Sequence, residues 1–408
     1  MAVVCVVLTH LFMYLDVTYL DAAHTTFLRW RFGHFAVLLF FVHTCLVLMY
    51  SLERQYAGGG GWRQLFNHFM MRRIFRVYPL SILIVLVVYF ARIPAAEFRP
   101  HALIGTEVGV TGLLANLALV QNLTYTQSIL AQLWSLPVEI QMYLLLPALY
   151  LFARRWQSLR PLLLVWIGAV AFASIQPMIS ERLSIAQYIP NFLPGVIAYR
   201  AAGLSRSSPT WPAFWWPIML MAMGVLYTVT QPYEHGWILC LITGLTANRF
   251  REIRLGWLRR AAHLLAKYSY GIYLTHVIAL WLGLELLGGF SPALRWTIFA
   301  VTLVAIPFLL YHTVEAPMTR FGATLAQRWY PARHAPPRAL PELDETTPLD
   351  RRQLDALLLP AAAAEQDGAG NGQGRERDGD RPRYALRTHA EVAREPPRER
   401  NLPQPKAN

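Results

Sequence analysis

The chain has 408 residues, of which 55% are hydrophobic and 15% are charged, a composition that argues against a soluble protein. Its long apolar runs lack period-2 alternation, so they predict membrane helices and exclude a β-barrel. The net charge of +13 belongs to the part before residue 335, where basic residues flank apolar runs. Contact with anionic headgroups explains that excess, and no nucleic-acid binding is expected.

Ten apolar runs approach the roughly 20 residues that cross a bilayer as a helix, which predicts an all-α fold, a polytopic transmembrane bundle. The predicted spans lie at about 1–15, 33–51, 78–93, 134–153, 161–178, 188–201, 212–231, 236–248, 264–287 and 294–315. The run at 110–121 is too short to cross and is expected to be a partial or re-entrant element.

Basic segments between the spans set the predicted orientation. With ten full crossings they all fall on one side of the membrane, which places both termini in the cytoplasm. Residues 1–330 form the predicted membrane domain. Residues 331–408, rich in Pro, Gly and charged residues, have too few large apolar side chains to form a core, so we expect a disordered cytoplasmic tail.

His10 is the first polar residue expected inside a span, in "AVVCVVLTHLFMYL". A neutral imidazole can be buried at moderate cost and can take a proton from a hydroxyl near neutral pH. A purely structural histidine, hydrogen-bonded between helices, is the alternative.

The segment "MRRIFRVYPL" places Arg72, Arg73 and Arg76 where a helix enters the membrane from the cytoplasm. Arg72 and Arg76 are four residues apart and share a helix face, an arrangement that suits phosphate groups. Anchoring of the helix by snorkelling arginines explains the spacing equally well.

In "LWSLPVEIQMYLLLP", Trp134, Ser135, Glu139 and Tyr143 fall near one face of an otherwise apolar helix. A carboxylate inside a span is costly and must be paired or functional. The residues alone leave two roles open for Glu139: a salt bridge to a neighbouring arginine, or direct participation in catalysis or substrate orientation.

In "YSYGIYLTHVI", Ser269, Tyr273 and His276 form a polar stripe on an apolar helix, which either lines a cavity or joins helices. Glu315, before Pro317, is expected to end the last span near the cytoplasmic surface and to have a structural role. The three cysteines are scattered and indicate no metal site.

No P-loop, GxSxG, HExxH or dinucleotide motif is present. However, seven segments in order resemble the membrane acyltransferase 3 family, bacterial integral-membrane proteins that acylate hydroxyls, mostly on carbohydrates. The segments are "VVLTH", "AVLLFFVHTCLVLMYSLER", "RRIFRVYPL", "LWSLPVEIQMYLLLP", "NFLPGVIAYR", "YSYGIYLTH" and "YHTVEAPMTRFG". The resemblance runs from the first residue to about Gly322.

The resemblance implies roles for particular residues. His10 matches the family's essential first-span histidine and would be the general base. Arg72, Arg73 and Arg76 match its basic motif, thought to meet the phosphates of the acyl donor. Glu139 and Tyr143 match a further family segment and would belong to the site.

Two features depart from the family. An arginine commonly precedes the first-span histidine, at a place that would lie before Met1, which implies a start further upstream. The second span carries Val42-His43-Thr44 where the family often has Ser-Gly.

These inferences predict an O-acyltransferase of the bacterial inner membrane that binds no permanent cofactor. Acyl-coenzyme A, with acetyl as the expected acyl group, would be the co-substrate, and a carbohydrate or glycoconjugate the acceptor. Trp134, Ser135, Tyr273 and His276 are expected to line the substrate site.

Two other functions fit the same polar residues. One is a transporter of a lipid-linked sugar or organic anion, because intramembrane His, Glu and Arg also line transport paths. The other is an inactive sensor or scaffold that keeps the fold.

Overall fold

The computed structural model describes residues 2–15, 23–57, 60–93, 95–96, 103–104, 108–180, 184–204, 209–230, 234–252 and 255–331. The chain divides into two units, Met1–Leu358 and Leu359–Asn408, and every described residue belongs to the first. Except for Pro331, the predicted tail at 331–408 lies outside the described residues, so its disorder stays a prediction.

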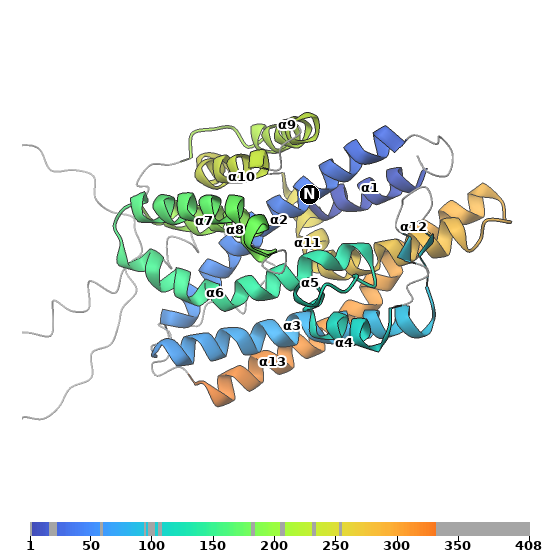
Figure 1. Ribbon diagram of the computed structural model, residues 1–408, viewed down its shortest axis with the longest axis horizontal. Helices are drawn as coiled ribbons and strands as arrows, with labels where there is room; N and C mark the ends of the chain where they lie inside the picture. The colour runs from blue at the N-terminus through green and yellow to red at the C-terminus, as the bar shows by residue number, and fades with distance from the viewer. Residues whose placement is uncertain are drawn as a thin grey trace, which may run out of the picture. The chain divides into compact units, whose positions relative to one another are not determined.

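The predicted all-α membrane bundle is confirmed for the described part of the chain (Figure 1). Its α-helices are α1 (Ala2–Leu15), α2 (Ala23–Ala57), α3 (Trp62–Phe90), α4 (Val110–Ala118), α5 (Gln121–Thr124), α6 (Ser135–Arg155), α7 (Arg160–Ile179), α8 (Ile185–Leu204), α9 (Trp215–Val229), α10 (Glu234–Thr246), α11 (Gly256–Leu280), α12 (Pro292–Leu310) and α13 (Ala316–Trp329). Short 3₁₀ helices are η2 (Ala131–Trp134) and η4 (Ala247–Arg249), and π-helices are η5 (Trp281–Glu285) and η6 (Tyr311–Glu315). Strands β1 (Ala95–Ala96) and β2 (Leu103–Ile104) pair antiparallel.

Each of the ten predicted spans coincides with a helix. Among the residues that the structure describes, five stretches are both long and apolar enough to cross a membrane: Leu28–Ala57, Trp62–Phe90, Ala131–Arg155, Arg160–Ile179 and Pro292–Trp329. The number of crossings therefore stays a prediction. The short run predicted at 110–121 contains α4, whose 9 residues extend only about 14 Å and cannot cross a hydrocarbon core of about 30 Å.

Two helices continue well beyond the predicted spans, each with a proline in its interior or just after it. Helix α3 begins at Trp62, before the predicted span at 78–93, and Pro79 lies inside it. The helix of the predicted span at 294–315 does not stop at Glu315, because the wider π turn of η6 carries it past Pro317 into α13. Where these helices leave the membrane stays a prediction. In membrane helices an interior proline is tolerated where neighbouring groups satisfy the freed backbone atoms.

Helix α8 shows how this tolerance arises. Pro194 has no N–H to donate to the carbonyl of Pro190, and the indole Nε1 of Trp166 on α7 donates to that oxygen instead, at 2.9 Å. Gly195 then lets α8 approach α2 closely, since a Cβ there would lie 2.5 Å from the carbonyl oxygen of Val42. The motif "NFLPGVIAYR" thus serves helix packing.

The helices that carry the candidate site pack against one another. Helix α1 contacts α2 and α11, while α6 contacts α2, α3 and α8. Helix α3 also runs side by side with α13, the orange helix in Figure 1. The predicted polar residues of four distant segments are thereby brought into one region.

Candidate functional site

A cavity of about 370 Å³ lies where α1, α2, η2 and α11 meet. His10 lines this cavity, together with Trp134 and Tyr273. Three residues predicted from separate segments therefore line one cavity. Ser135 and His276, also predicted to line the site, are not among the lining residues; both are buried behind it.

The imidazole of His10 contacts two groups at its Nδ1 atom. The carbonyl oxygen of Val6, one turn earlier on α1, lies 2.9 Å from it, and Nε2 of His276 on α11 lies 3.2 Å from it. The two ring centroids are 4.9 Å apart with an interplanar angle of 59°. His276, with no exposed surface, therefore supports His10 from behind.

Hydrogen bonds around Tyr273 fix the next part of the wall. Its hydroxyl donates to the carbonyl oxygen of Gln132 at 2.6 Å, and Ser135 Oγ lies 2.7 Å from the same hydroxyl. Because a phenol has one proton, Ser135 is the donor in that second bond. The amide of Gln132 donates in turn to the carbonyl oxygen of Leu274 at 3.0 Å. These bonds tie η2 and the start of α6 to α11.

Aromatic side chains form much of the cavity lining, and they include two residues that sequence reasoning missed, Trp30 and His34. His34 is stacked between Trp30 and Trp134, with both centroid distances 5.3 Å and interplanar angles of 19° and 25°. Its Nδ1 lies 3.0 Å from the hydroxyl of Tyr227 on α9. His34 follows Trp30 by four residues and so shares a helix face with it, which was a usable signal, but it stood at the edge of the predicted second span.

Glu139 lies one helical turn beyond Ser135 on α6 and is only 7% exposed. The hydroxyl of Tyr143 donates to its Oε1. Both Arg76 and Arg73 act on this carboxylate electrostatically. Arginine charges therefore compensate the buried carboxylate of Glu139, whereas its part in catalysis or substrate orientation stays a prediction.

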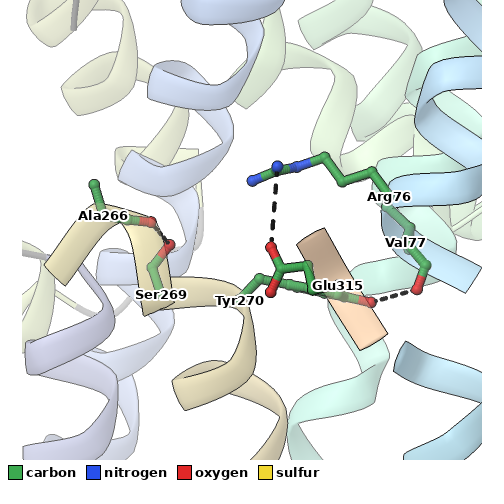
Figure 2. Close-up of polar contacts among 6 residues, drawn as sticks. All are labelled: Arg76, Val77, Ala266, Ser269, Tyr270 and Glu315. Atoms are coloured by element: carbon green, nitrogen blue, oxygen red, sulfur yellow. Dashed lines mark hydrogen bonds and ion pairs between the residues drawn. The ribbon is translucent and has the colours of Figure 1, made fainter. Parts of the chain in front are cut away.

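The basic motif divides between two environments. Arg72 is partly exposed, whereas Arg73 is only 4% exposed, with its guanidinium carbon 5.6 Å from the centre of the Phe69 ring. Arg76 Nη1 lies 4.0 Å from Oε1 of Glu315, which is buried in η6 (Figure 2). This pairing agrees with the structural role predicted for Glu315, which is 1% exposed; its predicted position near the cytoplasmic surface stays a prediction.

Helix α11 packs against α3 next to this basic motif. The hydroxyl of Tyr270 donates to the carbonyl oxygen of Val77 on α3 at 2.7 Å, and Ser269 donates to Ala266 at 2.8 Å within α11 itself (Figure 2). Thus, of the predicted polar stripe, Tyr273 reaches the cavity wall while Ser269 does not. Within the described residues, no group of three or more His, Cys, Asp or Glu side chains could hold a metal ion.

A family model described as an acyltransferase domain matches residues 1–312, which is more than half of the chain. The match includes every predicted site residue from His10 to His276, and Glu315 follows shortly after its end. No curated protein gives a significant match. No solved structure gives a significant match.

Proposed function

The chain belongs to the acyltransferase 3 family and is a membrane O-acyltransferase; on this premise we propose that it transfers an acyl group, acetyl in the first instance, from acyl-coenzyme A to a hydroxyl of a carbohydrate or glycoconjugate. The observation that carries the proposal is the position of His10 on the wall of a cavity of about 370 Å³. A cavity with aromatic walls and a few convergent polar groups suits a polar organic acceptor.

His10 is proposed as the general base. Its imidazole takes the proton of the acceptor hydroxyl, and the hydroxyl oxygen attacks the thioester carbonyl carbon. The new carbon–oxygen bond forms as the carbon–sulfur bond breaks, and the leaving thiolate takes the proton back from His10. Tyr273 donates its hydroxyl proton to Gln132 and Tyr143 donates to Glu139, so in this state neither proton is available to a developing oxyanion.

The donor proposal rests on the basic motif of α3. Arg72 and Arg76 are partly exposed and are assigned to the phosphates of the donor, which guanidinium groups bind bidentately. Arg73, which is buried and acts on Glu139, is assigned to holding that carboxylate in place. The pantetheine arm would then carry the thioester to the cavity that His10 lines.

We further propose that the protein lies in the bacterial inner membrane with both termini in the cytoplasm. Its basic segments would then face the cytoplasm, where acyl-coenzyme A is made, in accordance with the positive-inside rule. Orientation is tested by cysteine labelling from either side of the membrane, at the exposed residues Arg160 and Glu234.

The function is tested with purified protein in detergent, radiolabelled acetyl-coenzyme A and a panel of glycans. His10→Ala should abolish transfer, whereas His43→Ala, a histidine of α2 outside the cavity lining, should leave it unchanged. Arg72→Ala should raise the donor KM by roughly tenfold or more, the size of a lost charge-assisted hydrogen bond, with little change in kcat. Arg160→Ala is the matched arginine control.

Folded wild-type protein that neither transfers acetyl nor binds the donor would refute the donor assignment and favour transport. Transfer that survives His10→Ala at the wild-type rate would refute the assignment of the base while leaving the acyltransferase function intact.

A further inference from the structure

His276 contacts the candidate base without reaching the cavity. The side chain has no exposed surface and is not part of the cavity lining. Its Nε2 nevertheless lies 3.2 Å from Nδ1 of His10, a residue 266 positions away in the chain. Through this contact between α1 and α11, His276 can position the imidazole of His10 without binding the substrate.

Backbone carbonyls determine which nitrogen of His276 carries the proton. Its Nδ1 lies 2.8 Å from the carbonyl oxygen of Tyr273 and 3.2 Å from that of Ile272. Carbonyl oxygens only accept hydrogen bonds, so Nδ1 is the protonated nitrogen of the neutral ring. The Nε2 of His276 is then a bare acceptor directed at His10.

The same reasoning fixes the proton of His10. Its Nδ1 faces the carbonyl oxygen of Val6 at 2.9 Å on one side and the bare Nε2 of His276 on the other. Because both neighbours are acceptors, Nδ1 of His10 carries the proton and shares it between them. This tautomer leaves Nε2 of His10 unprotonated, the state that a general base requires.

We propose that His276 is a positioning residue that holds His10 in the Nδ1-protonated tautomer and accepts a hydrogen bond from the imidazolium that forms during acyl transfer. The inference rests on the proposed function, in which His10 is the base. His276 neither gains nor loses a proton: the hydroxyl proton moves to Nε2 of His10 and then to the leaving thiolate. Its task corresponds physically to that of the group that orients the histidine in a catalytic triad.

Three variants separate positioning from packing. His276→Leu removes the acceptor and should lower kcat by roughly 100-fold with little change in the KM of the donor. His276→Gln can place its amide oxygen near the position of Nε2, and should retain kcat within about tenfold of wild type. Thr275→Val alters the neighbouring buried residue, whose hydroxyl bonds to Gly271, and should leave kcat unchanged.

A second measurement does not depend on transfer. Nitrogen-15 NMR of histidine-labelled protein in detergent reports which ring nitrogen is protonated. We expect wild-type His10 to be protonated at Nδ1, and His276→Leu to shift its tautomer equilibrium while His276→Gln preserves it. Resonances are assigned by comparison with His10→Ala.

The outcomes are distinguishable. If wild-type protein transfers and His10→Ala does not, unchanged kcat in folded His276→Leu overturns the inference while the proposed function stands. If wild-type protein shows no transfer, the proposed function fails by itself, and an unchanged His10 tautomer in His276→Leu overturns the hydrogen-bond assignment separately. Equal losses in His276→Gln and His276→Leu would also overturn it, because packing and not the acceptor would then be responsible.

Discussion

Replacing Gly33 with alanine is expected to slow acyl transfer more than it destabilises the protein. Gly33 of α2 and Thr9 of α1 both line the cavity and pack against each other, and Thr9 is the residue next to His10. A Cβ at position 33 would lie 2.6 Å from Cγ2 and 2.9 Å from both Cβ and Oγ1 of Thr9. Rotation of the threonine side chain cannot relieve the contact with its Cβ, so the two helices must separate.

The size of the effect follows from these distances. Carbon atoms pack at about 3.5–4.0 Å, so α1 must move by roughly 0.5–1 Å at this point. Overpacking costs about 1–3 kcal/mol, partly offset by the gain of about 1 kcal/mol when alanine replaces glycine in a helix. The net loss of stability is therefore small, about 0–2 kcal/mol. A shift of about 1 Å in a reacting group can lower the rate by roughly 100-fold.

Two matched glycine variants make the experiment specific. Gly195→Ala creates an even closer contact, 2.5 Å from the Val42 carbonyl oxygen, but outside the cavity lining, and Gly168 has no atom within 4 Å of its Cβ position. Apparent melting temperature and kcat of the folded fraction are measured for all three. We expect Gly195→Ala to lose stability while keeping kcat, Gly168→Ala to change neither, and Gly33→Ala to lose kcat. Wild-type kcat in Gly33→Ala would refute the claim that this helix contact positions His10.

Three further substitutions test two buried charges and one hydrogen bond by thermal unfolding in detergent. Arg31→Leu should destabilise the protein by about 1–3 kcal/mol, because the guanidinium, 1% exposed, donates to the Tyr227 carbonyl oxygen at 2.9 Å and closes the end of α9; an unchanged melting temperature would contradict this. Glu139→Gln should cost about 3–5 kcal/mol, since it removes a buried counter-charge, whereas Tyr143→Phe should cost about 1–3 kcal/mol, the value of one hydrogen bond to a charged group. Equal shifts for these two variants would mean that the hydrogen bond, and not the charge, stabilises this region.

The helices were predictable because long apolar runs have few other solutions in a bilayer. The ends of the helices were harder to predict. The apolar run that predicted the third span begins at about residue 78, after the arginines, yet α3 begins at Trp62. At the last span, Pro317 was taken to end a helix that a π turn carries onward. In both cases local polarity or a proline outweighed a continuity that depends on neighbouring helices.

Most residues of the candidate site could be named from the sequence, but their pairings could not. His10 and His276 were each identified as polar residues inside apolar helices, while their contact depends on how α1 packs against α11. His34 was missed because a polar residue at the edge of an apolar run resembles a boundary. Arg73 was grouped with its neighbours, although burial separates it from Arg72.

The hydroxyl groups of α11 raise the question of proton leakage, a risk for any membrane protein with polar side chains in its interior. A row of side chains that each accept and donate a proton would act as a wire and leak the proton gradient that the membrane maintains. Here the hydroxyls of Tyr273, Tyr270 and Ser269 each donate to a backbone carbonyl, which has no proton to pass on. Each of these three described hydrogen bonds therefore ends at the backbone, so none of the three hydroxyls passes its proton to another side chain in this arrangement.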